Sequence, residues 1–296
     1  MLMITKFRYF VKTTVPTFLG HPLWEGKRFS PFLRFAQLQF RYALGRDTTQ
    51  QRWINGLALP LRKGDTGLTG NFYLGLHEFD TMAFTIHLLN AGDLFLDIGA
   101  NLGSYSLLAS GVCGARSIAF EPVPTTAKRL EEIIAINKLD HLVDTRQLAI
   151  SSPANANKPL LFSTDRGCMN AFVDSSYPGS TTTTLVSTLD LQCEGLEPTL
   201  LKIDVEGFEN DLLQGARQTL SQPSVLAVII EGQTQAINRQ FQELVFVDIQ
   251  YDALKRQIQP HQHLSANRIW IRADQHHSIQ SRLNRAPRRE VYGRTF

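Results

Sequence analysis

Cysteine is scarce in this chain of 296 residues, which has three, at positions 113, 168 and 193. Their odd number and scattered positions argue against a disulfide framework, and their spacing does not match that of a zinc site. No run of about 18 apolar residues occurs, so no segment is expected to span a membrane. The first 20 residues also lack the uninterrupted apolar run of a signal peptide. We therefore expect a cytoplasmic protein.

Acidic residues are scarce at both ends of the chain. Residues 1–52 hold nine Lys and Arg against two acids, and residues 282–296 hold five Arg against Glu290. Residues 53–281 hold 16 basic and 24 acidic residues. Basic ends of this kind suit peripheral contact with a membrane or another anionic surface, or they keep the protein in solution; the sequence leaves both interpretations open.

Composition predicts three parts: a basic, aromatic-rich extension over residues 1–74, a domain over residues 75–274 and a basic tail over residues 275–296. Within the extension, residues 30–45 predict a helix, with Ser at its start, Pro in its first turn and Gly after its end. The aromatic side chains of this helix either meet a lipid surface or a partner, or they pack on their own domain.

Strands alternate with helices from about residue 78 onward. Short apolar runs predict strands at residues 93–98, 116–120, 143–150, 199–205 and 225–230. Helical periodicity predicts helices at residues 79–89, 103–110, 125–138 and 208–220. A long insertion with a hairpin is expected at residues 153–185, and a helix and a closing pair of strands at 236–272. This order predicts an α/β fold: a doubly wound, mostly parallel sheet preceded by a helical or irregular extension.

Acidic residues stand at the ends of four predicted strands: Asp97, Glu121, Asp204 with Glu206, and Glu231. The carboxyl ends of parallel strands lie along the same edge of a sheet, which is where ligands bind. We therefore expect these carboxylates to gather at the functional site.

The turn after the first of these strands indicates the cofactor. Its glycines have the spacing Gly99-x-x-x-Gly103, whereas a dinucleotide site needs G-x-G-x-x-G. Asp97 lies two residues before the first glycine, where a carboxylate disfavours phosphate. S-adenosylmethionine has no phosphate and carries an ammonium and a sulfonium, so it suits an acidic turn. Glu121, 24 residues after Asp97, is placed to accept both ribose hydroxyls.

Three segments, residues 96–106, 120–122 and 201–209, resemble the hallmark blocks of FkbM-type methyltransferases. The resemblance covers roughly residues 75–272. It implies a class I, Rossmann-like methyltransferase fold and O-methylation of a hydroxyl, often on a sugar, glycolipid or secondary metabolite. The first 70 residues and the arginine-rich tail lie outside the pattern, so the identity of the acceptor is not carried over.

The resemblance also suggests roles for individual residues. It implies that Asp97, Gly99, Asn101 and Gly103 line the methionine end of the cofactor and that Glu121 holds the ribose. The full predicted cofactor-binding set is Asp97, Gly99, Ala100, Asn101, Gly103, Tyr105, Glu121, Pro122 and Asp204. Asn170, in the long insertion, either hydrogen-bonds to adenine or the acceptor, or is an ordinary turn residue.

Methyl transfer to a hydroxyl benefits from a positioned general base. Asp204 is the predicted base, with Glu206 beside it, because clustered carboxylates raise one another's pKa. Lys202 either offsets the acidic cluster or extends to solvent. A divalent cation held by Asp204, Glu206 and Glu231 is an alternative that we do not favour, so no metal ligand is predicted.

Three other functions compete with this prediction. A nicotinamide-dependent oxidoreductase is disfavoured by Asp97, by the glycine spacing and by the lack of a Tyr-x-x-x-Lys pair. A nucleic-acid methyltransferase would suit the basic ends, but residues 204–207 read Asp-Val-Glu-Gly where such enzymes often have Asp/Asn-Pro-Pro-Tyr, so nucleic acid is not the favoured partner. A non-catalytic cofactor-binding module is disfavoured by the intact acids at the strand ends.

Overall fold

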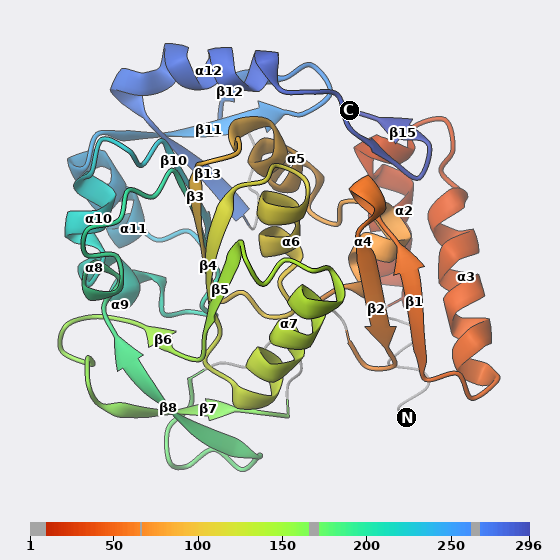
Figure 1. Ribbon diagram of the computed structural model, residues 1–296, viewed down its shortest axis with the longest axis horizontal. Coiled ribbons are helices and arrows are strands. Elements are labelled where there is room, and N and C mark those ends of the chain that lie inside the picture. Colours follow the sequence, from red (N-terminus) through yellow and green to blue (C-terminus); the bar gives the residue numbers. More distant parts are fainter. Residues whose placement is uncertain (1–9, 66, 166–171, 262–266) are drawn as a thin grey trace. The chain divides into compact units, whose positions relative to one another are not determined.

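The computed structural model describes residues 10–65, 67–165, 172–261 and 267–296. Its contacts divide the chain into two compact units (Figure 1). The smaller unit contains the residues up to Phe79 together with Arg288–Phe296, and the larger unit is Asp80–Pro287. The final residues therefore group with the N-terminal extension, although the division at residues 74/75 and 274/275 stays a prediction.

An eight-stranded sheet forms the centre of the larger unit, with the strand order β12-β11-β13-β10-β9-β3-β4-β5 among the described residues. The strands are β3 (Leu94–Ile98), β4 (Arg116–Phe120), β5 (Val143–Arg146), β9 (Leu200–Ile203), β10 (Ala227–Glu231), β11 (Phe246–Asp252), β12 (Gln257–Pro260) and β13 (Asn267–Arg272). The strands from β5 to β10 are parallel, and β13, β11 and β12 pair antiparallel. The predicted doubly wound, mostly parallel sheet is confirmed.

Helices lie on both sides of this sheet, with α5, α6 and α7 on one side and α8 to α11 on the other (Figure 1). The helices on the two sides are α5 (Phe79–Leu88), α6 (Ser104–Gly111), α7 (Pro124–Ile136), α8 (Leu189–Gln192), α9 (Glu209–Gln214), α10 (Arg217–Ser221) and α11 (Gln235–Glu243). A 3-10 turn (Ala273–Gln275) and α12 (His276–Arg285) follow the last strand of the sheet. Leu96, Leu201 and Val228 at the centre of the sheet are fully buried, which explains why these strands are continuous apolar runs.

The order of the strands fixes where a ligand can enter. From β3 the chain winds outward through β4 to β5, and then returns to place β9 and β10 on the other side of β3. A crevice opens outside the carboxyl ends of the strands at such a switch point. The site is therefore expected where β3 and β9 end.

Two predicted elements are each divided in the structure. The predicted strand at 143–150 gives β5 in the large sheet and β6 (Ala149–Ile150) in a small sheet with β7 (Pro159–Ser163) and β8 (Thr181–Ser187). The predicted helix at 208–220 gives α9 and α10, which are separated at Gly215. A Cβ at Gly215 would lie 2.2 Å from the Ser151 carbonyl oxygen, so glycine is required there, and the Gly215 carbonyl accepts a hydrogen bond from the Asp190 backbone at 2.9 Å.

The smaller unit contains the predicted helix at residues 30–45, which is α3 (Ser30–Ala43) and starts without a side-chain cap. Its other elements are a π-helical turn (Phe10–Thr14), α2 (Val15–Gly20), 3-10 turns at Pro22–Trp24 and Ile54–Gly56, β1 (Thr48–Arg52), β2 (Ala58–Arg62), α4 (Thr69–Leu74), β14 (Glu290–Val291) and β15 (Arg294–Thr295). The Arg34 guanidinium lies 4.3 Å from the ring centre of Trp24 and 4.0 Å from that of Tyr292. None of the described helices has the length and apolar character needed to cross a membrane.

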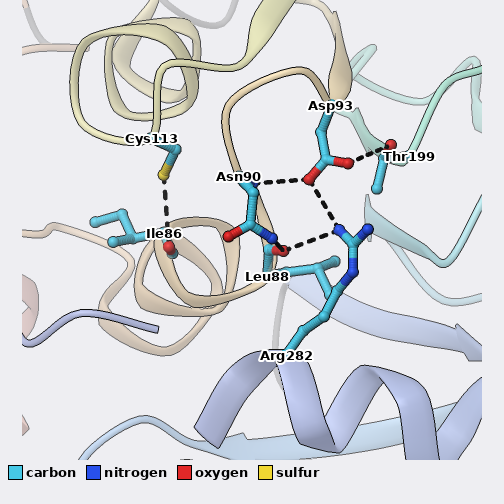
Figure 2. Close-up of polar contacts among 7 residues, drawn as sticks. All are labelled: Ile86, Leu88, Asn90, Asp93, Cys113, Thr199 and Arg282. Carbon is cyan, nitrogen blue, oxygen red and sulfur yellow. Dashed lines mark hydrogen bonds and ion pairs between the residues drawn. The ribbon is translucent and has the colours of Figure 1, made fainter. Parts of the chain in front are cut away.

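The predicted C-terminal tail is ordered into α12 and the β14–β15 hairpin. Figure 2 shows that Arg282 of α12 donates to the Asp93 carboxylate at 2.8 Å, and the same carboxylate accepts from the Asn90 backbone at 2.7 Å and the Thr199 hydroxyl at 3.3 Å. Asp93 and Thr199 precede β3 and β9. The network therefore joins α12 to the amino ends of the two central strands, opposite the expected site.

Replacing Arg282 by Gln should lower the free energy of unfolding by about 1–2 kcal/mol, because a charge-assisted hydrogen bond is lost at a site that is about one-third exposed. Urea denaturation measures this change. Arg285→Gln, at an exposed position of the same helix, is the matched control and should change stability by less than about 0.5 kcal/mol. Equal effects of the two substitutions would contradict a specific role for the Asp93 contact.

Candidate active site

A cavity of about 790 Å³, part of it open to solvent, lies at the carboxyl ends of β3, β4 and β9. Six of the predicted site residues line it: Gly99, Asn101, Glu121, Pro122, Asp204 and Glu206. The expectation that the strand ends form one site therefore agrees with the position of the cavity. Asp97, Ala100, Gly103 and Tyr105 do not line it, and Asn170 lies outside the described residues.

Asp97 lies beneath the glycine turn. Its side chain is buried, and Oδ2 accepts hydrogen bonds from the Ser106 backbone at 3.0 Å and the Ser106 hydroxyl at 2.6 Å. Burial raises the pKa of Asp97 to about 6, although the bonds from Ser106 and the charge of Lys202 oppose that rise. In this geometry Asp97 anchors the first turn of α6 and acts on the cavity through its charge.

The two glycines of the turn permit close packing of the backbone. A Cβ at Gly99 would lie 1.8 Å from the Asp204 carbonyl oxygen, and one at Gly103 would lie 2.4 Å from Leu130 of α7. Both glycines also have positive φ, at 80° and 78°. Glycine is therefore required here by the contact of β3 with the end of β9 and by the packing of α6 against α7.

Glu121 is held rigidly at the end of β4. Its Oε2 accepts from the Asn101 backbone at 3.0 Å, and its Oε1 accepts from the Val123 backbone at 2.9 Å. Asn101 reaches this position with φ = 50°, which asparagine adopts more readily than most residues. Burial raises the pKa of Glu121 to about 7. Each carboxylate oxygen retains a lone pair, so Glu121 can accept two more hydrogen bonds from a diol.

Apolar side chains also line the cavity, and three of them, Leu160, Phe162 and Phe172, come from the insertion. Phe172 packs edge-on against Phe208 at 4.7 Å between ring centres and contacts Phe162 of β7 at 6.3 Å. Leu148 also lines this apolar wall. These residues were not among the predicted site residues, because the insertion is rich in polar and small residues. A signal was present in the apolar run Leu160-Leu161-Phe162, which predicts a short strand.

Three carboxylates lie close together at the carboxyl ends of β9 and β10. Asp204, Glu206 and Glu231 each offer an oxygen within 4.8 Å of the others. A hydrogen bond with Asp204, together with burial, raises the pKa of Glu231 to about 8. Burial also raises the pKa of Asp204, but the charge of Lys202 and hydrogen bonds with Glu231 and Lys202 outweigh it, so the net pKa is lowered. The shared proton is therefore favoured on Glu231, and the expected rise in pKa within the cluster applies to Glu206 and Glu231 but not to Asp204.

Lys202 supports this cluster from inside the sheet. Its side chain is 3% exposed, and Nζ donates to Asp204 at 3.0 Å and to Asn267 at 3.2 Å. The ring of Tyr105 lies 5.4 Å from Nζ, which places this predicted cofactor-binding residue against the lysine. Of the two positions predicted for Lys202, the structure shows the buried one that offsets the acids. Asn267 was not among the predicted site residues.

Glu206 stands in a turn with unusual backbone conformation. Its φ is 51°, and that of the following Gly207 is 99°. A non-glycine residue in this region is strained, and such strain is retained where the surrounding structure needs it. Burial and the neighbouring Asp204 and Glu209 raise the pKa of Glu206. The turn thereby directs a third carboxylate to the cavity.

The model of the family described as the methyltransferase FkbM domain matches residues 97–265, which is more than half of the chain. This chain belongs to the FkbM methyltransferase family. The match includes the glycine turn, Glu121 and the acidic cluster, so the cavity lies within the family domain.

A curated relative of this FkbM-family chain is the hexuronic acid methyltransferase AglP of Haloferax volcanii. The two are 29% identical over 156 residues, which make up 52% of this chain and 62% of the relative. Among solved structures, the methyltransferase FkbM of Methylobacillus flagellatus is 13% identical, with 70% of this chain and 55% of that chain covered and a TM-score of 0.41. A putative transferase of Pyrococcus horikoshii is 12% identical, with 83% of each chain covered and a TM-score of 0.44.

Replacing Gly99 by Ala should lower the free energy of unfolding by more than about 3 kcal/mol, because the new Cβ would clash with the Asp204 carbonyl and would also favour another backbone conformation. The matched control is Gly92→Ala, at φ = 92° with no atom within 4 Å of the added Cβ. Backbone strain alone predicts about 1–2 kcal/mol there. Urea denaturation distinguishes the two, and equal losses would contradict the close approach at Gly99.

Proposed function

We propose that this methyltransferase transfers a methyl group from S-adenosylmethionine to a hydroxyl of a sugar or glycolipid. The observation that carries the proposal is that one cavity is lined by Glu121, which backbone hydrogen bonds hold in place, and by the carboxylates of Asp204 and Glu206. S-adenosylmethionine combines a ribose diol, an aromatic base and two positive groups, so it needs an acceptor pair, an apolar wall and nearby acids.

The residues of the cavity fit these three needs. Glu121 would accept the ribose hydroxyls, because its backbone bonds fix both oxygens and leave lone pairs free. Leu148, Leu160 and Phe162 would hold the base. Asp204 and Glu206 would stabilise the positive methionine end, and Asp97 would add its charge from below. When bound, the cofactor would supply the electrophilic methyl group.

The acceptor class rests on two supports. The relative from Haloferax volcanii is named for hexuronic acid, which is a sugar. The aromatic wall offers ring faces, which pack well against the apolar faces of sugars. Among the described residues that line the cavity, the charged ones are all acidic. This charge disfavours an acceptor that carries a carboxylate, as hexuronic acid does, so the relative supports a sugar as the acceptor class and not hexuronic acid itself.

The proton of the acceptor hydroxyl would pass to Asp204. At neutral pH Asp204 is ionised, and it is fixed by hydrogen bonds from Lys202 and from the protonated Glu231. Lys202, whose Nζ also donates to Asn267, would hold the Asp204 carboxylate in one orientation, so the carboxylate needs little reorganisation to accept the proton. Glu206 would sit beside the acceptor as a second carboxylate.

Isothermal calorimetry tests the cofactor. S-adenosylmethionine should bind, NAD should not, and Glu121→Gln should weaken binding by about tenfold or more, because one oxygen that accepts hydrogen bonds becomes a donor. Glu194→Gln, at an exposed position remote from the cavity lining, is the control and should leave affinity unchanged. Binding of NAD alone would overturn the proposal. Labelled-methyl transfer to cell-extract fractions then identifies the acceptor class.

Replacing Asp204 by Asn should lower kcat by about a hundredfold or more, because the base is lost, and should weaken S-adenosylmethionine binding to a smaller extent, because one of the carboxylates beside the positive methionine end is neutralised. Near-normal turnover with unchanged cofactor binding would contradict its role as base. Asp140→Asn, an exposed acid at the amino edge of β5, is the control. Loss of wild-type activity on exhaustive chelation would favour the metal alternative at Asp204, Glu206 and Glu231 instead.

The shared proton predicts a pH dependence. Glu231 ionises as pH rises through about 8, and Asp204 then loses a hydrogen-bond donor and becomes a stronger base. Wild-type kcat should therefore increase across this range. Glu231→Gln provides a permanent donor, so its activity at pH 7 should stay within about fivefold of wild type and the increase near pH 8 should vanish. A variant profile that keeps the increase would assign it to another group.

A further inference from the structure

Helix α3 carries a second apolar face that the smaller unit does not cover. Phe29, Leu33, Phe40 and Leu44 are 77%, 71%, 66% and 59% exposed. Leu33 and Phe40 lie within α3, and Phe29 and Leu44 are the cap residues at its two ends, with backbone conformations close to helical. At about 100° per residue, their spacing of four, seven and four positions places them on one side of the helix, within an arc of about 60°. We call these four residues the α3 stripe. Its length along the helix axis is about 22 Å.

The other side of α3 already forms the core of its unit. Phe32 and Phe35 pack edge-on against Phe18, and Leu38 and Tyr42 are buried. The apolar side chains that pack α3 against its unit therefore lie on this other side, and the α3 stripe is not needed for that packing. Aromatic residues of a surface helix often pack on their own domain, but the side chains of the α3 stripe do not, so their position needs another explanation.

The α3 stripe is also unusual for this chain. It contains four of the eleven large hydrophobic side chains that are exposed among the described residues, and both of the phenylalanines in that set. Single exposed apolar residues are common and need no explanation, whereas a contiguous apolar patch marks an interaction surface. The concentration on one helix face therefore points to a partner.

Positively charged residues lie near both ends of the α3 stripe. Lys27 and Arg28 precede it, and Arg46 follows it, all three at exposed positions. Of the two acids in residues 1–52, Asp47 lies 3.5 Å from Lys63, and Glu25 is exposed two residues before Lys27, so the three cations leave a net positive charge around the stripe. A surface that complements this arrangement must present negative charge around an apolar interior.

We propose that α3 docks this enzyme on an anionic lipid bilayer, with the α3 stripe in the interfacial region and Lys27, Arg28 and Arg46 at the headgroups. A bilayer interface presents phosphates at the level of the cations and acyl chains at the level of the rings, along the whole length of a helix lying in its plane. The proposal does not depend on the cofactor or acceptor proposed above, because it rests on the smaller unit alone.

Cosedimentation with lipid vesicles tests this proposal on the full chain. The protein should bind vesicles that contain phosphatidylglycerol and phosphatidylcholine, with an affinity that falls as the salt concentration is raised. Its affinity for vesicles of phosphatidylcholine alone should be lower by about tenfold or more. The double variants Leu33→Gln/Phe40→Gln and Lys27→Gln/Arg28→Gln should each lose about tenfold or more in affinity for the anionic vesicles.

The matched control is Leu185→Gln/Leu191→Gln, which removes two apolar side chains of similar exposure, 64% and 60%, from the larger unit. It should bind vesicles like wild type. All the substituted positions are exposed. Urea denaturation of each variant checks that its stability is unchanged.

Two results would overturn the proposal. One is equal binding of the wild type and the stripe variant to anionic vesicles, which would leave the stripe without a role in docking. The other is self-association in sedimentation equilibrium that Leu33→Gln/Phe40→Gln abolishes, with no vesicle binding, which would make a second copy of the chain the partner.

Discussion

The contact between the Gly99 turn and the end of β9 is the constraint on which the site depends. The Asp204 backbone donates to the Ile98 carbonyl at 2.9 Å, and the Gly99 and Ala100 backbones donate to the Phe120 carbonyl at 3.0 and 2.9 Å. Three strand ends are thereby joined by backbone bonds alone. Any side chain at position 99 would separate them. Because Glu121 and Asp204 leave this junction in fixed directions, the spacing across the cavity follows from the sheet and not from flexible loops.

The electrostatics of the site follow from the same geometry. Carboxylates at the ends of neighbouring strands are brought close together and partly removed from water, so burial raises the pKa values of Asp97 and Glu121 to about 6 and 7. Lys202, fixed between Asp204 and Asn267, is the buried cation that opposes this effect. A positively charged ligand would favour the ionised carboxylates further, and by linkage a site of this charge binds such a ligand more tightly as pH rises through those values.

The sequence predicted the elements well where apolar runs were buried on both faces, as at β3 and β4, and where one helix face was apolar, as at α7. The prediction was wrong where a contact with a residue far away in the chain changed an element. Gly215 separates the two helices that replace a predicted one, and its backbone packs against Ser151 and accepts a hydrogen bond from the Asp190 backbone, which periodicity cannot reveal. The C-terminal segment was predicted to be a basic tail, yet Arg282 is held by Asp93, a residue 189 positions earlier. Asn267 likewise gained its contact with Lys202 only through the antiparallel pairing of β13.

The glycine spacing, the acids at four strand ends and the alternation of strands and helices are local patterns, and they determined the fold class, the family and the edge of the sheet that holds the site. Tertiary structure decided which of those residues face the cavity. Asp97 turned inward to cap α6, Tyr105 packed against Lys202, and an aromatic wall came from an insertion with polar composition. The reason is that strand order and helix packing fix the direction of each side chain, and these depend on contacts between residues far apart in the chain.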